Sequence, residues 1–342
     1  MISRKSALVI GVLALATAYT GYWFYARTLA LQVIDNLTEQ RRAEGFTVSY
    51  DGPDISGFPL LVRAELENPR LERDAFAWRG ERLRIEMQPW NFRRIRIDLD
   101  GKQWVTPTAG AAQMVLVPAE AAVVANLSAT GRLADAALLV RDLTLSDPAG
   151  SSLLQAAELW LEATAPVEPP KSDQDASLAL SLSAADILLP KDVDGPLGRT
   201  LSKLRADLQV RGDVPSGSPA KALEAWRRGG GTVDVDWFQV NWGELDLRAK
   251  GTVALDAEAR PLGAFSTDIR GHNHALDALV AHAVLEPGAA TMAKIGLALL
   301  AKSPPEGGAP VLTLPVTAQD GHLYAGPFKI LDLVPIRLPA PR

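Results

Sequence analysis

The segment that decides the fold reads LDLRAKGTVAL, at residues 245–255. Every odd-numbered position in it is apolar or glycine, whereas the charged residues Asp246, Arg248 and Lys250 all fall at even-numbered positions. Successive side chains of a β-strand point to opposite faces of the sheet, so this alternation predicts a strand with one apolar and one solvated face. One solvated face is typical of antiparallel sheets, because parallel strands are covered on both faces.

The same alternation recurs on both sides of this segment. It is strict in residues 81–88 and 94–100, and it returns in residues 139–145, 178–182, 312–316 and 323–330. So many strands of this kind predict a mainly β fold (β-rich α+β) with a large, curved antiparallel sheet. An N-terminal transmembrane helix, and C-terminal helices that partly cover the sheet, complete the expected architecture.

The transmembrane helix is predicted from the run Ser6 to Ala26, which has no charged residue and is bounded by Lys5 and Arg27. Roughly 20 mainly apolar residues suffice to cross a bilayer core about 30 Å thick. Basic residues such as Arg4 and Lys5 favour the cytoplasmic side. We therefore expect a single-pass protein of the bacterial inner membrane, with its C-terminal domain in the periplasm.

A cleaved signal peptide is the alternative interpretation of this run, with Ala16-Thr17-Ala18 as the cleavage site. However, the run continues past this site into an aromatic cluster typical of a headgroup boundary, formed by Tyr19, Tyr22, Trp23, Phe24 and Tyr25. We therefore expect the helix to be retained. Both interpretations place the remaining chain outside the cytoplasm.

Three regions are expected along the chain. Residues 1–45 form the membrane anchor and a helical stalk, residues 46–165 a first β-sheet region, and residues 176–342 a second. The segment between the two sheet regions is rich in proline and charged residues, as exposed loops are. Within the second region, residues 274–302 are predicted to form a helical hairpin. Its second helix carries Met292, Ile295, Leu299 and Leu300 on one side, which suits it to cover a sheet.

The overall composition excludes several functions. The chain has 35 Lys and Arg against 40 Asp and Glu, so it lacks the excess of basic residues that is typical of proteins that bind nucleic acid. It has no cysteine, which excludes disulfides, thiolate catalysis and cysteine-ligated zinc.

Candidate catalytic and metal sites are weak. His272 and His274, with His282 or Asp277 as a third ligand, have the residue types of a metal site, but a polar loop that enters a helix has the same pattern. Two carboxylate pairs lie on single strand faces, as acid–base pairs would, namely Asp98 with Asp100 and Asp234 with Asp236. We predict no enzyme activity, no cofactor and no metal.

A basic, aromatic patch at residues 90–96 contains Trp90, Phe92, Arg93, Arg94 and Arg96. On an exported domain such a patch could touch anionic lipid headgroups. Alternatively, the arginine stems cover a solvated strand face.

Several glycine, aromatic and proline positions resemble an uncharacterised bacterial membrane-anchored family, domain of unknown function 2125. The residues that carry this resemblance are Gly57, Phe58, Pro59, Trp226, Gly229, Gly230, Trp242, Gly243, Gly326 and Pro327. The Gly-Phe-Pro turn and the Trp242-Gly243 segment are also similar to parts of AsmA-like envelope proteins, a likeness that implies curved sheets with an apolar inner face that handle lipid. We expect the motif residues themselves to be structural, with tryptophans as core anchors and glycines in turns.

The leading functional hypothesis is a non-catalytic envelope protein that binds lipid or lipid-like ligands along an apolar sheet face. Small and apolar residues at 121–124 and at Leu178, Leu180 and Leu182 motivate it. The alternative hypothesis is a scaffold or accessory subunit that docks a membrane complex.

Overall fold

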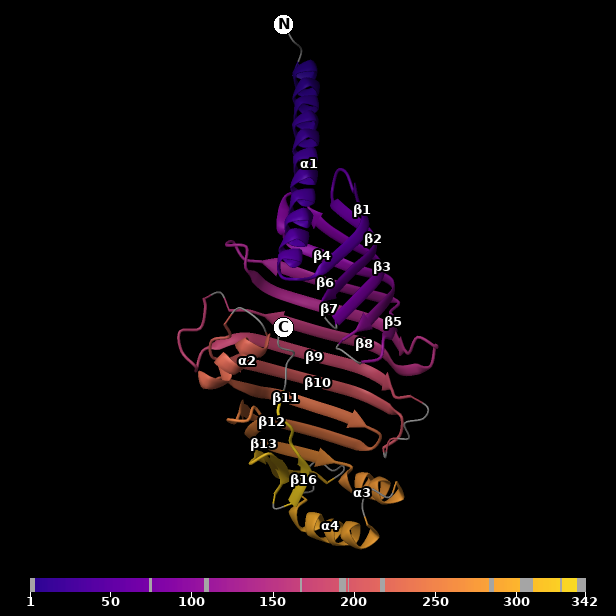
Figure 1. Cartoon of the computed structure of the whole chain (residues 1–342), viewed down its shortest axis with the longest axis vertical. Coiled ribbons are helices and arrows are strands. Elements are labelled where there is room, and N and C mark those ends of the chain that lie inside the picture. Colours follow the sequence, from indigo (N-terminus) through magenta and orange to yellow (C-terminus); the bar gives the residue numbers. More distant parts are fainter. Residues whose placement is uncertain are drawn as a thin grey trace. The chain divides into compact units, whose positions relative to one another are not determined.

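The computed structural model describes residues 4–73, 76–107, 111–166, 168–190, 195, 197–215, 219–282, 286–301, 310–326 and 328–336. Figure 1 shows that strands dominate the chain. Every strand pairing recorded among the described residues is antiparallel. The predicted fold class, mainly β with a large antiparallel sheet, an N-terminal apolar helix and few other helices, is confirmed.

Two compact units divide the chain. The first comprises Met1–Leu133 and Leu138–Leu153, and the second comprises Ala134–Ala137 and Leu154–Arg342. Residues 166 and 168–175 connect two neighbouring strands inside the second unit.

The first unit begins with one long helix, which strands follow in the order β1-β2-β3-β4-β5-β7, with β6 paired to β4 and β7. Its elements are α1 (Arg4–Ala43), β1 (Thr47–Ser56), β2 (Val62–Arg73), β3 (Phe76–Gln88), β4 (Asn91–Thr106), β5 (Met114–Val117), β6 (Glu120–Leu127) and β7 (Leu133–Ser146).

Helix α1 has two parts with different surroundings. The described part Leu8–Ala43 is long and apolar enough to cross a membrane, a test that a signal sequence also passes. Large apolar side chains near its start are exposed, among them Leu8 at 71% and Leu13 at 61%. Further along, Trp23, Ala26 and Ala30 are buried against the strands. One end of the helix therefore lacks a protein partner in the described chain, and the other end belongs to the core of the first unit.

The core under α1 is small and closely packed. Ala26 has no exposed surface and Val62 has 1%, and they form one cluster with Trp23 and Ala30. The short alanine side chains let the helix backbone approach the sheet closely, while the indole of Trp23 fills the remaining space.

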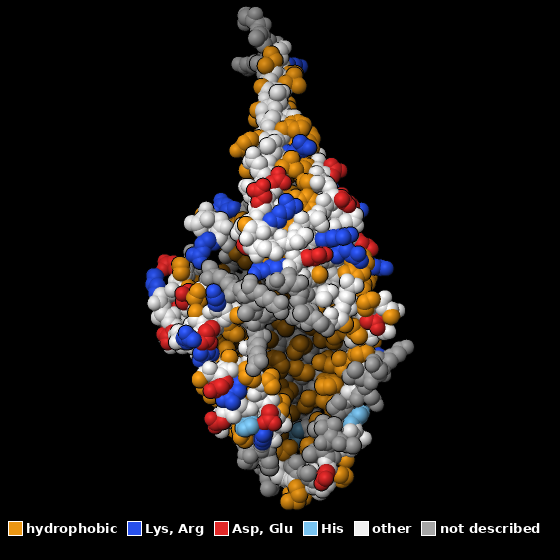
Figure 2. Space-filling view, in the orientation of Figure 1, with side chains coloured by type: hydrophobic (Ala, Val, Ile, Leu, Met, Phe, Trp, Pro, Cys, Tyr) orange, Lys and Arg blue, Asp and Glu red, His pale blue; other side chains and the backbone are white. Residues whose placement is uncertain are grey.

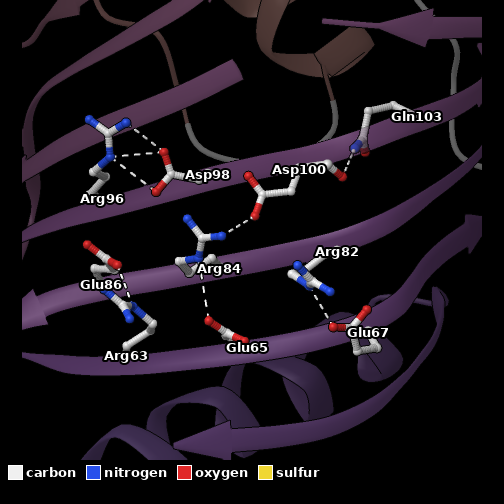
Figure 3. A network of polar contacts seen from close by, with 10 residues as sticks. All are labelled: Arg63, Glu65, Glu67, Arg82, Arg84, Glu86, Arg96, Asp98, Asp100 and Gln103. Atoms are coloured by element: carbon white, nitrogen blue, oxygen red, sulfur yellow. Dashed lines mark hydrogen bonds and ion pairs between the residues drawn. The ribbon is translucent and has the colours of Figure 1, made fainter. Parts of the chain in front are cut away.

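The other face of β2, β3 and β4 is charged. Cross-strand neighbours alternate in sign, and Figure 3 shows the Arg84 guanidinium between the carboxylates of Glu65 and Asp100 on the two adjacent strands. Arg84 lies 2.5 Å from Asp100 and 3.5 Å from Glu65. The other pairs are Arg63 with Glu86, Arg82 with Glu67, and Arg96 with Asp98. The strict alternation predicted for residues 81–88 and 94–100 thus places the charges of β3 and β4 on one face, and the register of β2 adds its own charges to that face.

Strands of the second unit follow one another in the order of the sequence, from β8 to β16. They are β8 (Ser152–Thr164), β9 (Ala176–Leu188), β10 (Thr200–Arg211), β11 (Thr232–Trp242), β12 (Leu245–Leu255), β13 (Pro261–Arg270), β14 (Leu312–Gln319), β15 (His322–Ala325) and β16 (Phe328–Asp332).

Three helices accompany these strands, namely α2 (Pro219–Arg228), α3 (His272–Ala281) and α4 (Pro287–Leu300). Helices α3 and α4 contact each other, as the predicted hairpin requires, although residues 283–285 and 302 lie outside the described residues. The prediction that the second helix covers a sheet with this side is wrong for Met292 and Ile295, which are 71% and 58% exposed, whereas the side chains of Leu299 and Leu300 lie outside the described part of the chain. Ala290, which is 4% exposed, marks the packed side of α4 instead.

We predict that Trp23→Ala lowers the free energy of unfolding of the first unit by about 3 kcal/mol or more, as expected when a buried large side chain leaves a cavity. The substitution also leaves the Leu61 carbonyl without the indole donor that lies 2.8 Å away. Denaturant unfolding of the full chain in detergent, followed by circular dichroism of the strands, measures this loss. The control Tyr25→Ala removes a ring that is 64% exposed, so its stability should match the parent. Equal stability of both variants would contradict this account of the core.

Candidate functional site

Apolar side chains form continuous rows across the strands of the second unit. The recorded registers align one row as Leu180, Leu208, Val235, Gly251, Phe265 and Val316. The next row consists of Leu182, Ala206, Phe238, Ala249, Thr267 and Leu314. We refer to these two rows as the apolar face. It exists because the two-residue period of each strand is kept in register with the next, and because an irregularity in β11 between Val235 and Phe238 returns Phe238 to the same face.

Thr267 is the single hydroxyl in these rows, and it does not make them polar. Its side chain is buried, and Oγ1 donates a hydrogen bond to the Leu314 carbonyl at 2.7 Å. Its one O–H donor is used inside the protein, and its burial keeps the oxygen away from a ligand. The apolar face therefore suits a ligand that is itself apolar.

Most side chains of the apolar face are half-buried, and they shield one another. Figure 2 shows hydrophobic side chains gathered in a hollow over this part of the second unit. In Figure 1, α2 lies at one end of the strands and α3 and α4 lie beyond β13. The described helices thus leave the middle of β9, β10 and β11 without a helical cover.

The opposite face of the same strands is polar and internally paired. Asp234 accepts hydrogen bonds from Arg211 and from the Thr252 hydroxyl, and these contacts lower the pKa of its carboxyl. Asp236 accepts a hydrogen bond from Gln209 at 2.9 Å. A general acid needs a raised pKa, so the lowered pKa of Asp234 suits an ion pair rather than proton donation.

The other predicted carboxylate pair has a similar environment in the first unit. Asp98, 8% exposed, is bound by Arg96 at 2.7 Å, and Asp100 is bound by Arg84. Each member of the pair thus has its own arginine partner on the charged face.

The histidines considered as metal ligands do not converge. His272 is buried, and burial lowers the pKa of its imidazole, whereas His274 is exposed. The His282 Nδ1 lies 2.9 Å from the Ala278 carbonyl oxygen, and Asp277 pairs with Lys294. Among the residues that the structure describes, no three or more His, Cys, Asp or Glu side chains are grouped to hold a metal ion.

The motif Gly57-Phe58-Pro59 forms the loop between β1 and β2. Gly57 has φ +100°, and a Cβ there would lie 2.8 Å from the Leu61 carbonyl oxygen, so the position requires glycine. Phe58 packs edge-on against Trp23 with ring centroids 5.4 Å apart. Sequence reasoning missed this contact with the helix; the aromatic cluster of α1 was the signal available for it.

The motif around Trp226 closes the end of α2. The buried Trp226 indole donates a hydrogen bond to the Arg211 carbonyl at 2.7 Å. A Cβ at Gly231 would lie 2.3 Å from the indole, which explains the glycine. Gly229 and Gly230 form the turn between them, and Gly230 has φ +79°.

Trp242 and Gly243 occupy the turn between β11 and β12. The half-buried Trp242 donates a hydrogen bond to the Gly198 carbonyl at 2.8 Å. Gly243 has φ +55°, and a Cβ there would lie 2.7 Å from the Leu197 carbonyl oxygen. Gly326 has φ +54° in a turn, whereas Pro327 lies outside the described residues. The contacts of these motif residues are thus with the protein itself.

These features define a class of protein, a mainly β chain with two compact units and one N-terminal helix long and apolar enough to cross a membrane. The chain belongs to the bacterial family described as "Uncharacterized protein conserved in bacteria (DUF2125)", which matches residues 23–333. This match confirms the resemblance to that family. None of the curated proteins compared with the chain matches it. The likeness to AsmA-like envelope proteins stays a prediction.

We predict that Gly231→Ala destabilises the second unit, because the added methyl group would overlap the buried indole of Trp226. Overpacking of this kind costs about 1–3 kcal/mol. The matched control is Gly288→Ala, where nothing lies within 4 Å of the new Cβ and alanine favours the helix. Thermal unfolding of both full-length variants measures the difference. A Gly231→Ala protein as stable as the control would contradict the assigned packing.

Proposed function

We propose that the protein is a non-catalytic, membrane-anchored protein of the bacterial envelope whose periplasmic part binds the acyl chain of a lipid along the apolar face. The observation that carries this proposal is the pair of apolar rows that cross β9 to β14.

The membrane part of the proposal rests on α1. Its first turns expose Leu8, Val9, Leu13 and Leu15. Large exposed apolar surfaces are costly in water but not in lipid. Trp23, Ala26 and Ala30, which form the core of the first unit, connect this exposed stretch directly to the strands. The exposed apolar surface favours a helix that spans the inner membrane.

The lipid part rests on the chemistry of the apolar face. An acyl chain needs no hydrogen bonds, and its transfer to an apolar surface is worth about 0.8 kcal/mol per buried CH₂ group. The face offers leucine, valine, phenylalanine and alanine side chains, and its one hydroxyl is already bonded. Tethering at a bilayer would supply such chains at high local concentration.

A second candidate function, a scaffold that docks a membrane complex, is favoured by α4. Met292 and Ile295 on this helix are 71% and 58% exposed. Exposed apolar residues on a helix are typical of surfaces that bind another protein. This alternative makes the apolar face a structural surface rather than a ligand site.

A topology reporter tests the membrane part. We predict that an enzyme active only outside the cytoplasm is active when fused after Arg342, because the basic residues Arg4 and Lys5 keep the N-terminus inside. The control fusion, placed before Met1, should be inactive. The intact mass of the mature protein then shows whether residues before Tyr19 are retained. Activity of the C-terminal fusion only in the cytosol would contradict the proposed location.

A photoactivatable fatty acid tests the lipid part. We predict that it labels peptides from β9 to β13 of the full chain in nanodiscs, and that Phe265→Glu reduces this labelling about tenfold or more. A buried carboxylate without a partner costs more than the 1.4 kcal/mol that a tenfold change represents.

The control for this variant is its neighbour Ser266→Glu. Ser266 is exposed on the opposite face and lies across from Lys250, so the new carboxylate is accommodated there. The pair Leu182→Glu and Ser183→Glu repeats the comparison on β9, and melting curves identify any variant that fails to fold. Equal labelling of the folded Phe265→Glu and Ser266→Glu proteins would contradict lipid binding at this face. If the fatty acid does not label the protein and the protein copurifies with a stoichiometric protein partner, the scaffold function is supported instead.

A further inference from the structure

Three aromatic side chains of α1 hold two loops of the first unit by direct hydrogen bonds. Tyr19 Oη donates to the Pro59 carbonyl at 2.6 Å, and Trp23 Nε1 donates to the Leu61 carbonyl at 2.8 Å. Tyr22 Oη donates to the Pro89 carbonyl at 2.6 Å. The loop between β1 and β2 and the turn between β3 and β4 are therefore fixed against the helix.

The positions of these bonds along α1 determine the depth of the two loops. The uncharged run starts at Ser6, and about 20 residues with a rise of 1.5 Å each cross a core about 30 Å thick. The far edge of that core thus falls near Ala26. Tyr19, Tyr22 and Trp23 lie seven, four and three residues before this point, so both loops bonded to them lie at the level of the bilayer itself.

Both loops expose large apolar side chains. Phe58 is 52% exposed, Leu60 is 63% exposed and Trp90 is 56% exposed. We refer to these three residues as the collar. Phe58 packs one edge against Trp23 and keeps about half of its surface exposed. In water this would be an unfavourable surface, whereas tryptophan and phenylalanine are favoured at a membrane interface.

Basic residues follow the collar directly. Arg93 and Arg94 lie at the start of β4, three and four positions after Trp90, and both are exposed. Arginines next to apolar anchors attract anionic headgroups, and this attraction is greatest close to the surface. Charge and apolar surface in this region thus match the same partner, a bilayer with anionic lipid.

From this geometry we infer that the collar is a second membrane-contact site, which inserts into the outer leaflet of the bilayer that α1 crosses. The inference rests on the proposed function in one respect, that α1 spans the membrane. It goes beyond a simple tether, because the core formed by Trp23, Ala26 and Val62 fixes the helix to the strands. The first unit therefore contacts the bilayer through its loops as well as through α1.

Site-specific fluorescent probes test whether the collar contacts the bilayer. Because the chain has no cysteine, a single introduced cysteine can be labelled without labelling of native residues. The variants Leu60→Cys and Trp90→Cys carry an environment-sensitive fluorophore in the full chain, in nanodiscs of phosphatidylethanolamine with some phosphatidylglycerol. Both positions are exposed, so the substitutions leave the core intact. We expect blue-shifted emission at both positions, and quenching by lipids with a nitroxide near the top of the acyl chain.

Two further probes separate the possible failures. Lys102 is an exposed residue of β4, eleven residues beyond its first residue Asn91. A fluorophore on Lys102→Cys therefore lies away from the collar and should not be quenched. Leu13→Cys lies in the exposed part of α1 and should be quenched by deeper nitroxides. Quenching at Leu13 without quenching at Leu60 and Trp90 would overturn the collar but leave the anchor. A Leu13 probe that is not quenched would overturn both the anchor and the collar. Equal quenching of the Lys102 and Trp90 probes would overturn the collar alone.

Discussion

The apolar faces of its strands, and the need to keep them from water, constrain this protein throughout. Each strand carries its apolar residues on one side, and burial of that surface is the dominant favourable term in folding. In the first unit the cover is α1, whose Trp23 and Ala26 pack on Val62. In the second unit the described helices lie toward the ends of the strands, and the apolar rows of β9 to β11 remain half-buried among themselves. The contrast between the two units is what makes the second apolar face a candidate binding surface.

The charged faces of the strands favour one pairing register between neighbouring strands and contribute little through burial. On β3 and β4 the pairs Glu86–Arg96 and Arg84–Asp98 are directly opposite each other. A slip by two residues would bring Arg84 opposite Arg96 or Glu86 opposite Asp98, and like charges in that position are destabilising. A slip by one residue would expose the whole apolar set. Half-exposed ion pairs contribute little each to stability, so their chief effect is to exclude these alternatives.

The family motifs act at the ends of the strands. The indole of Trp226 in α2 donates a hydrogen bond to the Arg211 carbonyl, and the indole of Trp242 donates one to the Gly198 carbonyl. Gly231 and Gly243 lie where a Cβ would collide with neighbouring atoms. These residues hold turns in place and so preserve the alignment of the apolar rows between them. Their chemistry is therefore consistent with a structural role that serves the sheet face rather than with direct contact to a ligand.

The sequence by itself determined the class of secondary structure and the N-terminal apolar helix, because both depend on local periodicity and composition. Residues 245–255 alternate regardless of what surrounds them, and Ser6 to Ala26 is apolar in any fold. Only the tertiary structure decided which surfaces are covered. The hydrogen bonds from Tyr19 and Tyr22 reach carbonyls 40 and 67 residues away, and the exposure of Met292 depends on how α4 packs. Such contacts join segments whose spacing in the chain has no regular period, so no pattern in the sequence could reveal them.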